Sequence, residues 1–188
     1  MPTAPQNTRN LDVLVVDDEP EILELLVEYF RDKGFEVAST GDGRAAVAAI
    51  EREPARYKLI LTDLQLPGAD GLTVLRAAKR ANPSCYVVII TGYASLDSAI
   101  QAVRHGAYDY LTKPFSMGQI DVIVQRVTDR LALEAENRLL SRQLGVARPN
   151  DDQEPGGLSH AVMARLETIE AKLTRLESLI GSLADRLR

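Results

Sequence analysis

The sequence LDVLVVDDEP, at residues 11–20, decides the fold. Its first six residues form a short run rich in Val and Leu, and Asp17, Asp18 and Glu19 follow at once. A short, nearly continuous apolar run predicts a central strand of a parallel sheet, covered on both faces. The three acids then stand where that strand ends, so the same stretch also predicts where the chemistry lies.

The same pattern recurs along the chain. Short apolar runs at 11–16, 35–38, 59–62, 86–90 and 108–111 alternate with amphipathic stretches at 20–33, 43–53, 71–81 and 95–104, and a further helix begins near residue 116. Strands that alternate with helices are typical of a parallel sheet with right-handed crossovers. We therefore expect an α/β fold, a doubly wound sheet of five parallel strands.

The chain changes character after this domain. We expect a flexible N-terminus at 1–10, the domain at 11–131, a helical extension at 132–144, a Pro- and Gly-containing linker at 145–157 and a coiled-coil helix at 158–188. The last prediction rests on apolar residues that alternate four- and three-residue steps, which is a heptad seam that needs a partner helix. These residues are Val162, Leu166, Ile169, Leu173, Leu176, Ile180, Leu183 and Leu187.

Composition excludes several classes of protein. The 188 residues carry a net charge of -5, which argues against broad binding to nucleic-acid phosphates. A single cysteine, Cys85, excludes an internal disulfide framework, and with only His105 and His160 beside it structural zinc is excluded too. No apolar stretch is long enough to span a membrane and residues 1–10 lack the core of a signal peptide, so we expect a cytoplasmic protein.

Polar residues gather at the expected strand ends. Asp17 and Asp18 follow the first strand, Asp63 ends the third, Thr91 ends the fourth and Lys113 follows the fifth. Converging carboxylates repel one another unless a divalent cation neutralises them, and oxygen ligands select ions such as Mg²⁺. A carboxylate nucleophile, a metal, a hydroxyl and an ammonium group together suit a phosphoryl group.

Four motifs at these strand ends resemble the receiver domains of bacterial two-component response regulators, the CheY-like family. They are VVDDEP at 15–20, LTDLQLPGADG at 61–71, IITGYAS at 89–95 and DYLTKPF at 109–115. The resemblance covers about residues 10–130 and implies a flavodoxin-like sheet in the order 2-1-3-4-5. It also implies a cis peptide bond before Pro114 and phosphotransfer from a sensor histidine kinase.

The resemblance also assigns roles. It makes Asp63 the phosphoacceptor, and it places Mg²⁺ on Asp63, on Asp18 directly and on Asp17 through water, with Gln65 counted among the metal positions. By the same resemblance Thr91 closes on the phosphoryl group and Lys113 pairs with it. Two residues complete the set: Tyr110 as the aromatic switch and Gly92 as the small residue that leaves room for phosphate.

The resemblance is incomplete at three positions near the site. Leu66 replaces the more usual Met before Pro67, and Gln65 and Tyr93 occupy variable positions that tune phosphate lifetime in the family. None of these departures removes a catalytic group.

The leading hypothesis is a response regulator that is not an ordinary enzyme, lacks a DNA-binding output domain and signals by self-association or partner binding through its helical tail. One alternative is a Mg²⁺-dependent phosphohydrolase, although Gln65 stands where such an enzyme places a second carboxylate. Another is a DNA-binding regulator, although the helix at 158–188 has no basic face. We expect no nucleic-acid or membrane partner.

Overall fold

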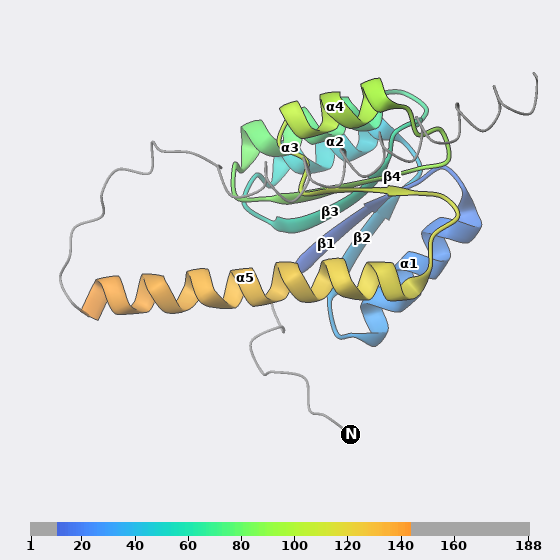
Figure 1. The fold of residues 1–188 in the computed structure, drawn as a ribbon. Coiled ribbons are helices and arrows are strands. Elements are labelled where there is room, and N and C mark those ends of the chain that lie inside the picture. The colour runs from blue at the N-terminus through green and yellow to red at the C-terminus, as the bar shows by residue number, and fades with distance from the viewer. Residues whose placement is uncertain (1–10, 144–188) are drawn as a thin grey trace, which may run out of the picture. The chain divides into compact units, whose positions relative to one another are not determined.

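The structure is a computed structural model that describes residues 11–143, with side chains up to residue 140. It consists of alternating strands and helices (Figure 1). Their bounds are β1 Asp12–Val16, α1 Pro20–Asp32, β2 Glu36–Thr40, α2 Gly43–Arg52, β3 Tyr57–Asp63, α3 Gly71–Ala81, β4 Tyr86–Thr91, α4 Leu96–Arg104, β5 Asp109–Thr112 and α5 Met117–Gln143. The expected N-terminal segment 1–10, the linker and the heptad seam lie outside these residues.

The five strands form one sheet in the order β2-β1-β3-β4-β5, and every pair is parallel. This confirms the fold class and strand order that the sequence predicts. The crossover from β1 through β2 to β3 places β1 and β3 side by side in the middle of the sheet. The residues that follow these two strands, near Asp17 and Asp63, therefore meet at one edge.

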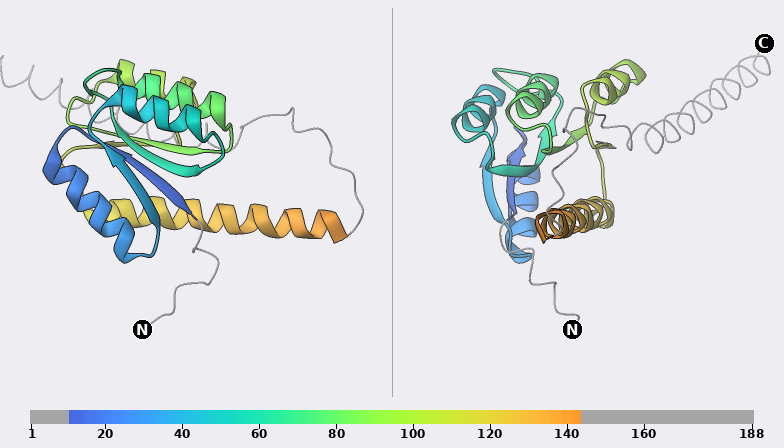
Figure 2. Two further views of the ribbon diagram at one scale, coloured as in Figure 1. Left: turned by 180° about the vertical axis from the view of Figure 1, so that it is seen from behind. Right: turned by 90° about the vertical axis from the view of Figure 1, so that its left-hand side faces the viewer.

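The sheet lies between two layers of helices (Figure 2). On one face α1 and α5 pack through residues such as Phe30 and Val127, and on the other α2, α3 and α4 pack through residues such as Leu75 and Ala102. Alternate residues of each strand serve the two cores, so that Val15 faces α1 and α5 while Leu14 faces the opposite layer. Both faces of the central strands are buried, which explains their nearly continuous apolar sequence.

Four strands, β2, β3, β4 and β5, extend beyond the apolar runs that predict them. In β2 the polar residues Ser39 and Thr40 continue the pairing with Val15 and Val16. In the same way Asp63, which follows the apolar run 59–62, is the last residue of β3 and pairs with Ile90, as the sequence analysis expects. Pairing uses backbone groups, so a strand continues through polar side chains that the apolar pattern does not reveal.

Helix α5 runs on past the sheet. Its first half packs on the sheet, whereas Leu133, Leu139 and Leu140 in its second half are exposed. The two halves are one continuous helix that runs to Gln143 (Figure 1). Within residues 11–143, no helix is both long and apolar enough to cross a membrane.

Candidate functional site: an acidic cluster at the carboxyl edge of the sheet

Three carboxylates gather at the carboxyl edge of β1 and β3. One carboxylate oxygen from each of Asp17, Asp18 and Asp63 lies within 4.8 Å of the others. Asp17 and Asp63 are buried, and Asp18 is exposed. The three residues that the sequence predicts as acidic metal ligands are thus brought together, and their oxygen donors fit a divalent cation such as Mg²⁺.

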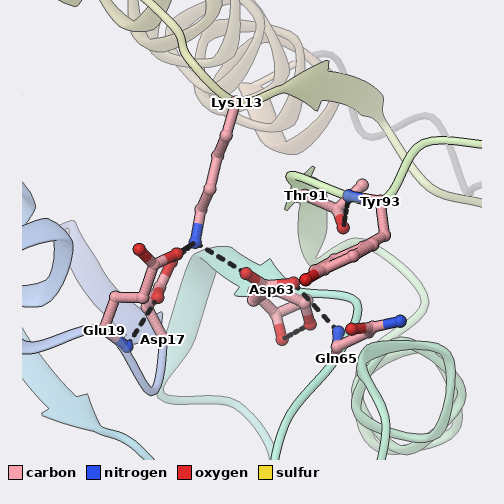
Figure 3. A network of polar contacts seen from close by, with 8 residues as sticks. Asp17, Glu19, Asp63, Gln65, Thr91, Tyr93 and Lys113 are labelled. Atoms are coloured by element: carbon pink, nitrogen blue, oxygen red, sulfur yellow. Dashed lines mark hydrogen bonds and ion pairs between the residues drawn. The ribbon is translucent and has the colours of Figure 1, made fainter.

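Lys113 neutralises part of this cluster. Its Nζ lies 2.8 Å from Asp17 Oδ2, 2.6 Å from Asp63 Oδ2 and 2.7 Å from Glu19 Oε1, as Figure 3 shows. Burial alone would lower the pKa of Lys113, but the hydrogen bonds to Asp17, Asp63 and Glu19 outweigh it and raise the pKa well above its usual range. The ammonium group therefore stays charged at any physiological pH.

The surroundings of Asp17 disfavour its ionised form. Burial raises its pKa from 3.8, and the hydrogen bonds from Lys113 and from the Glu19 backbone N–H only partly offset that effect. The charge of Asp63 raises the pKa further. A second cation at this edge would stabilise the ionised form of Asp17.

The Asp63 side chain and the loop that follows it are held in place by neighbouring residues. Its Oδ1 accepts a hydrogen bond of 2.9 Å from the Gln65 N–H, and its Oδ2 accepts one from Lys113 (Figure 3). Helix α3 begins directly against this residue, since a Cβ on Gly71 would lie 2.1 Å from the Asp63 carbonyl oxygen. Only glycine permits this close approach, which fixes the loop between β3 and α3.

Thr91 and Lys113 lie on neighbouring strand ends. Thr91 is fully buried, and its Oγ1 accepts a hydrogen bond of 3.1 Å from the Tyr93 N–H. Its carbonyl oxygen accepts one of 2.8 Å from the Lys113 N–H, which ties the end of β4 to the residue that follows β5. The peptide bond between Lys113 and Pro114 is cis, as the sequence resemblance predicts.

Tyr110 lies on β5 and is partly buried against the core on the side of α2, α3 and α4. Its hydroxyl is 2.9 Å from Ser98 Oγ on α4. At Gly92, an added Cβ would meet only the Lys113 Cβ, at 4.0 Å, so no neighbouring protein atom requires glycine there.

Sequence reasoning missed two contacts of the site residues. Glu19 stands in the quoted acidic stretch, but its ion pair with Lys113 joins residues 94 positions apart. Ser98 carried no signal beyond its place near the start of a helix. Gln65, which the sequence analysis counts as a metal position, contacts Asp63 through its backbone N–H.

The remaining candidate residues are the cysteine and the two histidines, for which the sequence predicts structural roles. Cys85 is buried, and burial raises the pKa of its thiol to about 11, so it stays protonated and unreactive at neutral pH. His105 follows the last residue of α4, and its backbone N–H donates to Gln101. His160 lies beyond the described residues.

The fold and this cluster define a doubly wound α/β domain with an acidic site at the carboxyl edge of its sheet, and comparison with known proteins identifies its family. Residues 13–125 match the model of the response regulator receiver domain. Because this match covers more than half of the chain, the chain belongs to the response regulator receiver family.

Individual relatives agree with this assignment. The nitrogen assimilation regulatory protein NtrX of Azorhizobium caulinodans is 37% identical over 133 residues, which are 70% of this chain and 29% of NtrX. The receiver domain protein of Clostridium thermocellum superposes with a TM-score of 0.61 at 28% identity, over 65% of this chain and 98% of that one. The BeF3-activated DrrB receiver domain does so with a TM-score of 0.57 at 26% identity, over 63% and 97%. The chain thus spans less than a third of the length of NtrX.

Proposed function

We propose that this protein accepts a phosphoryl group on Asp63 from a sensor histidine kinase, with Mg²⁺ held by Asp17, Asp18 and Asp63. The observation that supports this most strongly is the position of Asp63. Its carboxylate lies beside two further carboxylates and 2.6 Å from an ammonium group, at the end of a central strand. Family membership supports the same assignment.

In the proposed reaction an oxygen of Asp63 attacks the phosphorus of a phosphohistidine. The P–N bond breaks, the imidazole leaves, and an acyl phosphate forms on Asp63. Mg²⁺, when bound, neutralises the charge on the phosphoryl oxygens. The Gln65 N–H already donates to Asp63, and it orients the carboxylate for attack.

Lys113 and Thr91 respond to the product in this proposal. Lys113 Nζ contacts Asp17, Glu19 and Asp63 together, so it can keep one contact with Asp63 while it pairs with a new phosphoryl oxygen. Thr91 Oγ1 turns from the Tyr93 N–H toward that oxygen, and Tyr110 follows as the switch. The product is a signalling state rather than a released chemical product, so we do not class the protein as an ordinary enzyme.

The proposed output is self-association or partner binding through helices, in the cytoplasm. The second half of α5 exposes Leu133 and Leu140, which lie seven residues apart and so on one face of the helix. The heptad seam in 158–188 continues this character in the sequence. The charges of that segment nearly cancel, so the proposal gives it no DNA-binding role.

The phosphoacceptor is tested by Asp63→Asn. We expect wild type incubated with acetyl phosphate and Mg²⁺ to gain the mass of one phosphoryl group, and the variant to gain none, because an amide is not a nucleophile of this kind. Intact-protein mass spectrometry measures the gain. Asp32→Asn, at an exposed position of α1, serves as the matched control and should behave as wild type. Undiminished labelling of Asp63→Asn would contradict the site assignment.

The output is tested separately by replacing Leu173 and Leu176 with Asp. Burying unpaired carboxylates in a helical seam costs several kcal/mol, so the oligomer should dissociate while labelling of Asp63 persists. Light scattering after size exclusion gives the mass. Thr174→Asp, outside the seam, is the control. Equal mass for wild type and the double variant would show that the seam is not an assembly surface.

A further inference from the structure

Lys113 has an acceptor for each hydrogen of its ammonium group. An ammonium group carries three hydrogens, all of them donors. The Lys113 Nζ lies 2.8 Å from Asp17 Oδ2, 2.7 Å from Glu19 Oε1 and 2.6 Å from Asp63 Oδ2. Three short contacts with three carboxylates use all three hydrogens. A phosphoryl oxygen can therefore gain a hydrogen bond from Lys113 only when one of these carboxylates gives up its own.

The three carboxylates differ in what they lose when Lys113 leaves them. The side chain of Asp17 is 2% exposed and that of Asp63 is 7% exposed, whereas that of Glu19 is 57% exposed. A buried carboxylate that loses its cation stays desolvated and unpaired, which is costly. An exposed carboxylate instead regains water, and its ion pair contributes little stability in the first place. The contact with Glu19 is therefore the one that Lys113 gives up most readily.

Glu19 stands at the start of α1 but does not cap that helix with its side chain. It is the residue before Pro20, in the N-cap position, and its side chain makes no capping hydrogen bond. The residues preferred at this position are serine, threonine, aspartate and asparagine, not glutamate. Its backbone N–H donates a hydrogen bond of 3.0 Å to Asp17 Oδ1, and its carboxylate reaches Lys113 (Figure 3). The side chain of Glu19 thus serves the acidic site rather than the helix.

We propose that Glu19 is a positioning residue that occupies the hydrogen of Lys113 which a phosphoryl oxygen on Asp63 takes. Glu19 thereby competes with the phosphoryl group for Lys113 and weakens its binding. This inference rests on the proposed function, because it assumes that Asp63 carries the phosphoryl group and that Lys113 pairs with it. The sign of the effect distinguishes this role from a supporting one. Loss of a supporting residue weakens binding of the phosphoryl group, whereas loss of a competitor strengthens it.

The sign can be measured with beryllofluoride, a mimic of the phosphoryl group, while Mg²⁺ is kept saturating. In Glu19→Gln a neutral amide of the same size replaces the carboxylate and holds Lys113 more weakly. The concentration of beryllofluoride at half saturation should fall by about threefold, the effect of losing one exposed ion pair. Glu21→Gln removes the same charge from an exposed position in the first turn of α1, and it should leave this midpoint unchanged.

A second variant separates the contact with Lys113 from the charge of Glu19. In Glu19→Asp the charge stays, but the side chain is one methylene shorter. Because aspartate is a preferred N-cap, its carboxylate should turn to the free N–H groups of α1 instead of Lys113. The midpoint should therefore fall as it does in Glu19→Gln. Urea unfolding checks that both variants are folded under the conditions of the titration.

Three results would decide against these expectations. An unchanged or raised midpoint in Glu19→Gln or in Glu19→Asp would overturn the role of Glu19. An equal fall in Glu21→Gln would show a general effect of charge, and would overturn that role as well. Failure of wild type itself to bind beryllofluoride would instead overturn the proposed function, and this inference with it.

Discussion

The two ends of the sheet are built in opposite ways. At the carboxyl edge the carboxylates of Asp17, Glu19 and Asp63 surround the ammonium group of Lys113. Asp18 lies beside Asp17 and Asp63 in the same cluster. At the other end Tyr86 and Tyr108 pack edge to face, with ring centroids 4.9 Å apart, and the Tyr86 hydroxyl donates a hydrogen bond of 2.9 Å to Glu134 of α5.

The carboxyl edge is therefore suited to chemistry, whereas the amino end anchors α5. The carboxyl edge holds excess negative charge that a cation or a phosphoryl reaction can change, so its electrostatic energy depends on what binds. The amino end holds a neutral aromatic pair and one hydrogen bond to a carboxylate, which fix the place where α5 leaves the sheet. Changes at the first end should respond to Mg²⁺, and changes at the second should not.

The largest expected effect is that of Lys113→Met. It leaves Asp17 and Asp63 buried without their common partner, and breaking a buried ion pair in this way costs about 3 kcal/mol or more. We expect the free energy of unfolding, measured in urea, to fall by that order without Mg²⁺ and by less with it. An equal loss with and without Mg²⁺ would contradict the view that the metal and Lys113 neutralise the same charges.

The pH dependence of this effect has a definite sign. Burial raises the pKa of Asp17 above 3.8, so the folded protein binds this proton more tightly than the unfolded chain does. The contribution of that proton to stability is complete below pH 3.8 and is lost as the pH rises through the raised pKa. Without Lys113 the hydrogen bond and charge that oppose this rise are gone. Lys113→Met should therefore lose most stability at neutral pH and approach wild type as the pH falls toward 3.8, as urea unfolding at several pH values would show.

Asp18→Ala should have the next largest effect, on the metal rather than on the fold. It removes the exposed carboxylate of one proposed metal ligand. We expect the affinity for Mg²⁺, measured by calorimetric titration, to fall by about tenfold or more. The control is Asp32→Asn, at an exposed position of α1. Asp42→Ala is not suitable, because the Asp42 side chain caps the N-terminus of α2. Unchanged Mg²⁺ affinity would place the cation elsewhere.

The smallest effect is expected at the amino end. Tyr86→Phe removes only the hydroxyl that donates to Glu134, which is worth about 1 kcal/mol. Hydrogen exchange should rise in α5 near Glu134, while phosphorylation and the Mg²⁺ dependence of stability stay as in wild type. An altered rate of phosphorylation would show that the two ends are not independent in the way that the comparison implies.

The sequence predicts the five strands well because parallel strands buried on both faces need apolar side chains on both faces. It predicts the acidic cluster because parallel strand ends meet at one edge, which brings Asp17 and Asp63 together from positions 46 apart in the chain. Contacts that depend on long side chains or on loop conformation are harder to predict from the sequence. The reach of Lys113 to Glu19 and the bond between Ser98 and Tyr110 join segments whose relative placement only tertiary packing determines.

The most direct test of the central claim is to locate the modified residue after phosphorylation. Borohydride reduces an acyl phosphate on aspartate to homoserine, which leaves a permanent mass change in one peptide. After treatment with acetyl phosphate and Mg²⁺, peptide mass mapping should find homoserine at position 63, and no such change when Mg²⁺ is removed by a chelator. Reduction at another aspartate, or at none while phosphate is incorporated, would contradict the assignment of Asp63 as the phosphoacceptor.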